Sequence, residues 1–190
     1  MKKLVVLFGL LCIYTSGFAQ ADKTSIGLFE FEIGGDMIFG NKVGYQSIKP
    51  GFELNLESRF NLNNSPFDVG FQLALGQFYR KDESYSYGVR YVPSMIFTCD
   101  YNYRISKVIA PYGGLGIGLS RSLYDVLEYD EWTGEDKINR VPDTRIVIYP
   151  RIGVELIEHI RLNLGYKCYL DKFHNTFMLG IGYVFGGVSK

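Results

Sequence analysis

The charged residues of this chain are sorted along its length, and they are the first candidates for chemistry. Acidic residues dominate the first part, at Glu30, Glu32, Asp36, Glu53, Glu57 and Asp68. Basic residues dominate the later part, with two acids among them, at Arg90, Asp100, Arg145, Arg151, Glu155, Arg161 and Lys167. Charges that face one enclosed space either line a path for ions or pair with one another, because an unpartnered buried charge is costly. We expect a paired network, since the narrow enclosure predicted below leaves little free bore.

The residues that could carry catalysis are few. The chain has only two histidines, His159 and His174. A serine hydrolase needs a nucleophile, a base and an orienting acid within hydrogen-bonding distance of one another. Asp171 lies close to His174 in the sequence, but no spacing brings a serine to the pair. No His, Asp or Glu spacing typical of a metal site is present, and the glycine-rich stretch 113–118 lies inside a predicted strand. We therefore predict no catalytic residue, no cofactor and no metal site.

The segment 121–142 combines aromatic and acidic residues. Tyr124, Tyr129 and Trp132 lie among six acids there. Exposed aromatic side chains on loops are common recognition elements. The segment either folds over the mouth of the structure or extends two strands as a hairpin. In both cases we predict that these three aromatics are the main external contacts, with a ligand that the sequence does not identify.

The elements that position these residues are strands, because apolar and polar residues alternate along almost the whole chain. Eight such stretches follow one another, at 29–34, 52–57, 67–76, 87–100, 114–119, 145–156, 160–167 and 177–185. Short turns (61–66, 102–107 and 157–159) alternate with longer connections (40–48, 80–84, 121–142 and 171–175). This pattern predicts an all-β fold, an eight-stranded antiparallel up-and-down barrel that spans a membrane.

The alternation alone does not say which face points inward. An apolar interior would make a soluble, lipocalin-like barrel, and an apolar exterior a membrane barrel. The polar face is rich in glycine and in charges of both signs, which is a poor lining for an apolar ligand. Aromatic residues near the strand ends are typical of the two membrane interfaces, here Phe29, Phe39, Phe67, Tyr87, Tyr101, Tyr183 and Phe185. We predict an apolar exterior, with bulges at Pro93 and Pro150 because proline interrupts a strand ladder.

Composition excludes several other classes of protein. The 190 residues carry 20 basic and 20 acidic side chains, so the basic surface of a nucleic-acid-binding protein is missing. A mean hydropathy of +0.01 excludes a multi-span helical membrane protein. Residues 1–20 have the positive start, the short apolar core and the small residues of a secretory signal peptide, with cleavage between 19 and 21. Residues 21–190 then form one barrel domain, in which Cys99 and Cys168 have no CxxC partner.

Two motifs carry a resemblance to a known family. The first is the stretch Pro111–Gly118 (PYGGLGIG), and the second is the last strand, with Gly180, Tyr183 and Phe185. With these motifs the mature chain resembles the small OmpA/OmpX-type outer-membrane β-barrels of Gram-negative bacteria, often called porin-family barrels. The last strand departs from the family's C-terminal assembly signal at Met178, and residues 186–190 extend beyond the final aromatic.

The resemblance implies where the chain works and what it contacts. It implies an outer-membrane location, contact with outer-membrane lipid, and recognition of Gly180, Tyr183 and Phe185 by the barrel-assembly machinery. Closure leaves no free sheet edge in the barrel, so a monomer is expected. We predict a non-enzymatic structural or surface-interaction role, in envelope integrity or adhesion. The alternatives are a narrow channel for ions or small solutes, a lipid-modifying enzyme at the rim, or a component of a secretion machine.

Overall fold

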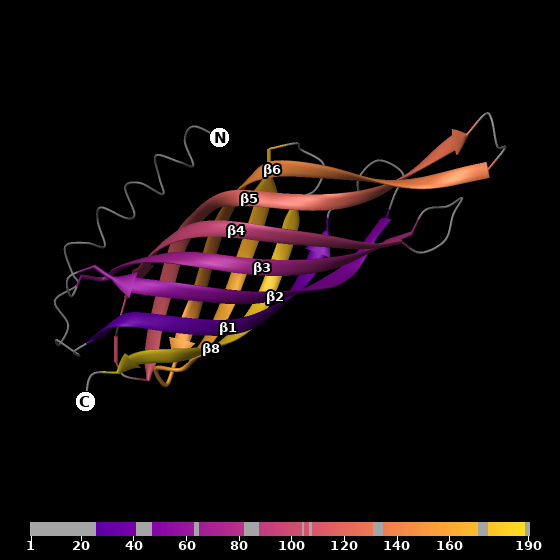
Figure 1. Cartoon of the computed structure of the whole chain (residues 1–190). Helices are drawn as coiled ribbons and strands as arrows, with labels where there is room; N and C mark the ends of the chain where they lie inside the picture. Colours follow the sequence, from indigo (N-terminus) through magenta and orange to yellow (C-terminus); the bar gives the residue numbers. More distant parts are fainter. Residues whose placement is uncertain are drawn as a thin grey trace, which may run out of the picture.

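A computed structural model describes residues 26–40, 47–62, 65–81, 88–103, 105–106, 108–130, 135–170 and 175–188. It contains eight strands in these residues, which are β1 (Ile26–Gly40), β2 (Ser47–Asn61), β3 (Phe67–Lys81), β4 (Gly88–Asn102), β5 (Ile109–Asp130), β6 (Glu135–Leu156), β7 (Ile160–Tyr169) and β8 (Thr176–Val188). Each strand pairs with its sequence neighbours in antiparallel fashion, and β1 pairs with β8 to close the barrel (Figure 1). The predicted fold class is confirmed. The signal peptide predicted at residues 1–20 lies outside the described residues.

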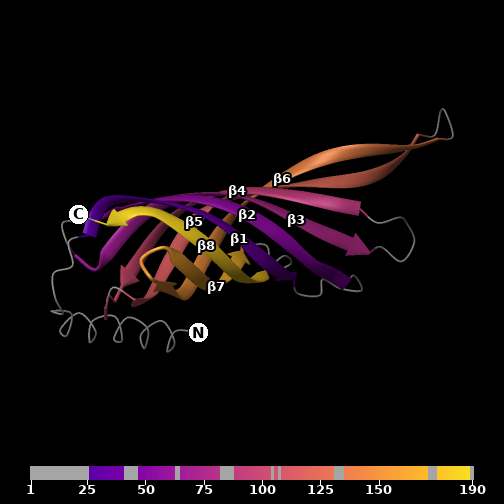
Figure 2. The same cartoon turned by 90° about the horizontal axis from the view of Figure 1, so that it is seen from below.

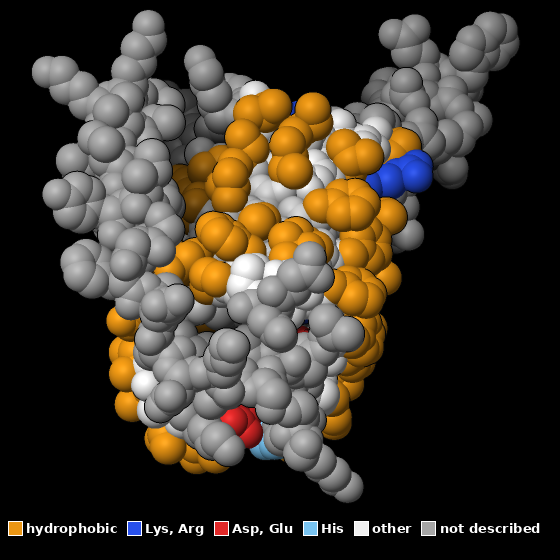
Figure 3. Space-filling model, turned by 90° about the vertical axis from the view of Figure 1, so that its left-hand side faces the viewer, with side chains coloured by type: hydrophobic (Ala, Val, Ile, Leu, Met, Phe, Trp, Pro, Cys, Tyr) orange, Lys and Arg blue, Asp and Glu red, His pale blue; other side chains and the backbone are white. Residues whose placement is uncertain are grey.

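The strand alternation separates an apolar outside from a polar inside. On β1, the side chains of Ile33 and Met37 are exposed while those of Glu32 and Asp36 are buried. The same division holds on the other strands, and Figure 3 shows hydrophobic side chains gathered over the outer wall of the barrel. Phe97, near the middle of β4, is 64% exposed. Such a continuous apolar wall is too large for a water-facing surface and matches the lipid-facing band of a membrane barrel.

Aromatic side chains gather at the end of the barrel where the turns are short. Phe29 packs on Phe60 with ring centroids 5.0 Å apart, and Phe67 packs on Tyr101 at 5.1 Å. Tyr183 and Phe185 on β8 meet at 4.8 Å. At the other end, Phe39 and Phe177 are 6.3 Å apart. These pairs form the two aromatic girdles that the sequence predicts, with the side chain of Tyr87 outside the described residues.

The prediction of bulges at Pro93 and Pro150 is wrong. The β3–β4 register runs through Leu75↔Pro93 without a shift, and the β5–β6 register runs through Leu115↔Pro150 in the same way. On its other side Pro93 lies just beyond the last β4–β5 pair, and Pro150 lies in a gap in the β6–β7 ladder. On that side, each proline therefore lies where the ladder has ended or is interrupted. The strand needs no extra, bulged residue to accommodate the proline. The β2–β3 register shifts instead between Lys49 and Phe52, beside Pro50.

Strands β5 and β6 continue well beyond the barrel wall. They pair without interruption from Ile109↔Leu156 to Asp130↔Glu135. The pairing of β5 with β4, in contrast, ends at Ser94↔Ser120, so the rest of β5 pairs only with β6. Figures 1 and 2 show the resulting two-stranded ribbon projecting from one end of the barrel. Of the two alternatives for the segment 121–142, the structure therefore shows the hairpin extension. Trp132 lies outside the described residues.

The three short turns lie at the opposite end from this hairpin. The turn between β6 and β7 is the tightest, and Ile157 and Glu158 adopt positive φ angles of 53° and 61° there. A hydrogen bond from Ile157 N to Val108 O, at 2.9 Å, joins this turn to the one before β5. Among the described residues, no helix has the length and apolar character needed to cross a bilayer.

The apolar outer wall generates a stability prediction. Replacing Phe97 by Arg puts a charge near the middle of the lipid-facing band and should lower the free energy of unfolding in lipid vesicles by about 2–4 kcal/mol. The exposed Ile105, in a turn at the barrel end, is the matched control. Ile105→Arg should change stability by less than about 1 kcal/mol, because the depth penalty vanishes near the interface. Equal effects at the two positions would contradict a lipid-facing wall.

Candidate functional site

The interior of the barrel is built around Arg151 on β6. Its Nε and Nη2 donate to the two oxygens of Asp100 at 2.9 and 2.7 Å. Its Nη1 donates to Glu57 Oε2 at 2.6 Å, and Nη2 also reaches Glu57 Oε1. Thr98 Oγ1 donates to Glu57 at 2.9 Å. One planar guanidinium thus joins β2, β4 and β6 across the lumen, using the fork geometry that suits carboxylates.

Arg161 on β7 extends this centre toward the short-turn end. It donates to Asp100 Oδ2 at 3.0 Å, and it forms ion pairs with Glu32 at 3.5 Å and Glu155 at 3.9 Å. Its guanidinium carbon lies 3.6 Å from the ring centroid of Tyr112, in cation–π contact. Side chains from four other strands, β1, β4, β5 and β6, therefore meet at this one residue of β7.

Arg59 on β2 completes the network, and the sequence analysis missed it. It pairs with Glu30 at 3.2 Å and also with Glu32. It is almost fully buried. Its signal was present, since Arg59 follows Glu53, Asn55 and Glu57 at the same period of two and must share their inward face.

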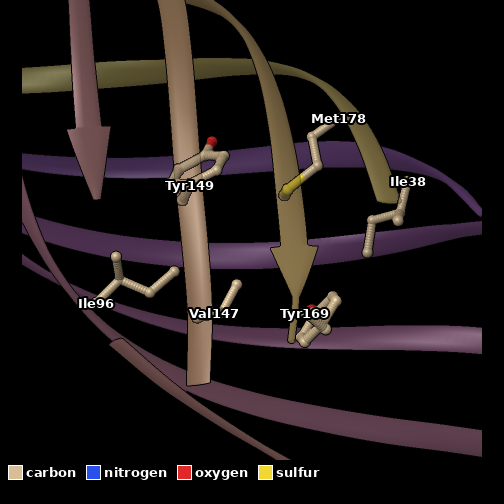
Figure 4. Close-up of a cluster of buried hydrophobic side chains, with 6 residues drawn as sticks. All are labelled: Ile38, Ile96, Val147, Tyr149, Tyr169 and Met178. Carbon is tan, nitrogen blue, oxygen red and sulfur yellow. The ribbon is translucent and has the colours of Figure 1, made fainter. Parts of the chain in front are cut away.

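The outer part of the lumen combines one ion pair with an apolar cluster. Lys167 Nζ donates to the two oxygens of Glu53 at 2.6 and 2.7 Å and lies 3.3 Å from Ser94 Oγ. Six inward-pointing hydrophobic side chains from five strands form a buried cluster (Figure 4), namely Ile38, Ile96, Val147, Tyr149, Tyr169 and Met178. The ring centroid of Tyr149 lies 5.6 Å from Lys167 Nζ. The sequence analysis did not identify this cluster, because these residues occupy the same face as the charges.

Other predicted network residues lie at the two ends. Asp68 accepts hydrogen bonds from the side-chain amides of Asn61, at 2.7 Å, and Asn102. Arg145 is half-buried near the hairpin end. Arg90 lies on β4, but its side chain is outside the described residues, as are those of Tyr124 and Tyr129 on the hairpin.

Glycines make room for these inward side chains, in particular for acids and aromatic rings. A Cβ on Gly114 would come within 2.9 Å of the Asp100 carboxyl carbon, and one on Gly182 would come within 2.8 Å of that of Glu32. A Cβ on Gly165 would overlap the Tyr149 ring. The carboxylates and rings therefore reach the lumen centre across neighbouring strands that lack side chains at these points.

The residues with catalytic potential are not brought together in the described part of the chain. His159 Nδ1 lies 3.1 Å from the Val184 carbonyl oxygen, and its ring stacks on Tyr183 with centroids 5.5 Å apart. It therefore fixes β8 against the β6–β7 turn. His174 lies outside the described residues. No group of three or more His, Cys, Asp or Glu side chains in the described ranges could hold a metal ion.

The residues of the predicted C-terminal assembly signal lie on β8. Tyr183 and Phe185 point outward, and Gly180 faces the lumen beneath Asp36. The two aromatics are accessible on the lipid-facing wall, where another protein could contact them. Their recognition by the assembly machinery remains a prediction.

The central guanidinium generates a second stability prediction. Replacing Arg151 by Met should cost about 3–5 kcal/mol of unfolding free energy, because Glu57 and Asp100 would lose their main partner in a buried site. The triple variant Glu57→Gln, Asp100→Asn, Arg151→Met removes both carboxylate charges as well and should recover most of that loss. Denaturant unfolding of the refolded proteins measures both. A single variant as stable as the wild type would show that the network does not support the barrel.

Comparison with known proteins shows the fold. No protein-family model and no curated protein sequence matches the chain. Among solved structures, the neisserial surface protein NspA is 16% identical with a TM-score of 0.57, covering 85% of this chain and 99% of its own. Ail, the attachment invasion locus protein of Yersinia pestis, is 21% identical with a TM-score of 0.53, covering 84% and 99%. OprG from Pseudomonas aeruginosa is 14% identical with a TM-score of 0.51, covering 85% and 97%.

These structures show the fold of the chain, and one fold can host many functions. The apolar outer wall, the aromatic girdles and the shared fold agree with one another. The described residues of the chain have the fold of these small outer-membrane barrels, a closed eight-stranded antiparallel β-barrel with an apolar outer wall.

Proposed function

We propose that this chain is a non-enzymatic surface-interaction protein whose barrel is a closed anchor for the β5–β6 hairpin. The main support for a closed lumen is the set of four hydrogen bonds that Arg151 donates to Glu57 and Asp100. An eight-stranded barrel has an interior just wide enough to be filled by side chains. A side chain that bridges three strands in so narrow a space leaves no room for hydrated ions.

The hairpin supports the interaction role because its outer edges have free backbone groups. In the described residues, β5 has no β4 partner beyond Ser120, and β6 has no β7 partner before Val147. Open edges of this kind can add a strand from another protein. About ten residues on each side are available for such pairing.

Charge narrows the class of partner. The segment 121–142 carries six acids and three bases. Ail has been solved in complex with sucrose octasulfate, a heparin analogue. A sulfated ligand would be repelled by the acidic hairpin of this chain. We therefore propose a protein partner with a basic extended segment, and adhesion rather than enzymatic work on lipid.

The closed lumen predicts an electrically silent barrel. Purified protein in planar bilayers should give no stable conductance steps. The ion pairs of the lumen should stay formed and block the passage of ions. The measurement is a set of current recordings at several salt concentrations. Heat-modifiability on gels shows that the barrel used in them is folded. Stable large steps would favour the channel alternative.

Shortening the hairpin tests the interaction role. Deleting residues 126–137 joins Asp125 to Ile138, and because Asp125 pairs with Arg140, the two residues left between them can form a tight turn. The deleted protein should remain heat-modifiable. In nanodiscs it should lose at least tenfold in retention on polylysine-coated beads, whereas the intact barrel binds these beads and not heparin beads. Unchanged retention, or retention on heparin, would contradict the acidic hairpin as the contact surface.

A further inference from the structure

Two backbone hydrogen bonds show which residues of the β5–β6 hairpin face its open edges. In an antiparallel strand the N–H and C=O of one residue point toward the same neighbouring strand, and the direction alternates from residue to residue. Tyr103 N donates to Pro111 O at 2.8 Å, so the odd-numbered residues of β5 point toward β4. Leu170 N donates to Ile146 O at 3.3 Å, so the even-numbered residues of β6 point toward β7. The β5–β6 register has no shift, and both assignments therefore hold as far as the hairpin tip.

Pro93 on β4 explains why the β5 edge is open. The last β4–β5 pair is Ser94↔Ser120, and the next pair in this register would join Pro93 to Arg121. Pro93 lies an even number of residues from Tyr103 and therefore faces β5 in the same way. Because proline has no N–H to donate, the ladder between β4 and β5 ends at this point. Beyond it the hairpin projects without β4 (Figures 1 and 2), and the residues of β5 that face the open edge are Arg121, Leu123, Asp125, Leu127 and Tyr129.

Pro142 interrupts the opposite edge of the hairpin, on β6. It pairs with Leu123 in unbroken register, because its missing N–H lies on the side that faces away from β5. A strand that added to β6 would lose a hydrogen bond at Pro142 and would meet the proline ring. The β5 segment from Arg121 to Tyr129 contains no proline, so its edge offers an N–H and a C=O at every second residue.

The charges of the two strands favour the same edge. Residues 121–130 of β5 include three acids and one base, whereas residues 135–144 of β6 include three acids and two bases. A basic segment is therefore attracted more strongly to β5 than to β6. A second copy of β5 would bring two acidic segments together, and like charges on paired strands are destabilising.

We propose that a basic, extended segment of a partner protein adds to the hairpin at the β5 edge and not at the β6 edge. This assignment rests on the interaction role proposed above for the hairpin. The added strand covers about nine residues, from Arg121 to Tyr129, and its backbone bonds to the outward groups of β5. Pro93 frees this edge by ending the ladder with β4, and Pro142 makes the β6 edge unsuitable.

The test measures the affinity of a fluorescent basic peptide, Lys-Thr-Lys-Val-Lys-Thr-Lys-Val-Lys, for the barrel in nanodiscs. Leu127→Pro removes one outward N–H of β5 and leaves the bonds to β6 in place, because Leu127 faces the open edge. This variant should bind the peptide at least tenfold more weakly than the wild type. The matched control is Ile138→Pro, at the residue of β6 that pairs with Leu127. It should change the affinity by less than about twofold, since β6 takes no strand.

A second measurement keeps the proposal falsifiable if Leu127→Pro does not fold. The same peptide, N-methylated at two consecutive central residues, keeps all its charges but lacks N–H groups on both of its edges. It should bind the wild type at least tenfold more weakly than the unmodified peptide. Equal binding of the two peptides would overturn strand addition.

Retention on polylysine-coated beads separates a failure of this proposal from a failure of the hairpin function. Both proline variants keep every charge and should stay on the beads like the wild type. A wild type that stays on the beads but does not bind the peptide would overturn strand addition and leave the hairpin function standing, as would equal peptide binding by the two variants. A wild type that is dimeric in detergent and binds no peptide would place a second copy on the edge and overturn the proposal too. Failure of the wild type to bind the beads would contradict both.

Discussion

The pairing of charges inside a barrel that is surrounded by lipid is the constraint on which this structure depends. Arg151 holds Glu57 and Asp100 together, Arg161 joins Asp100 to Glu32, and Arg59 joins Glu32 to Glu30. These contacts link strands far apart in the sequence, and they replace the apolar core of a soluble protein. Because most apolar side chains face lipid, these polar contacts form much of the packing inside the closed wall. Removing one member leaves the others charged in a site that water does not reach.

The same constraint explains why the lumen holds both ion pairs and a small apolar cluster. Tyr149 belongs to the cluster, yet its ring centroid lies 5.6 Å from Lys167 Nζ and 5.8 Å from the guanidinium carbon of Arg151. Ile38, Ile96 and Met178 are buried in the same cluster as Tyr149. Such packing keeps water from the ion pairs and strengthens their attraction. The described interior of the barrel is thus filled by side chains, and the proposed interaction surface lies outside it, on the hairpin.

The strands on either side of β8 carry charges of opposite sign. Glu30, Glu32 and Asp36 lie on β1 and Arg161 and Lys167 on β7, so the strands around the closing β1–β8 seam carry opposite charges. The seam itself has glycines on β8, at Gly180 and Gly182, over which the β1 carboxylates lie. A small residue on one strand and a long acid on its partner let the two edges meet closely. The β1 carboxylates and the β8 glycines therefore fit together along the seam.

The sequence by itself determined the eight strands, their order and which side of each faces lipid, because a period of two is a local property that survives any tertiary arrangement. It also indicated that Arg151, Arg161, Lys167 and the early acids face one interior. The same alternation also places Arg59 on the inward face, because Arg59 lies two residues after Glu57. Only the tertiary structure decided which charge meets which, because partners such as Lys167 and Glu53 are 114 residues apart. Strand register, which depends on all eight strands closing at once, also decided that Pro93 and Pro150 need no bulge and that 121–142 is a paired hairpin.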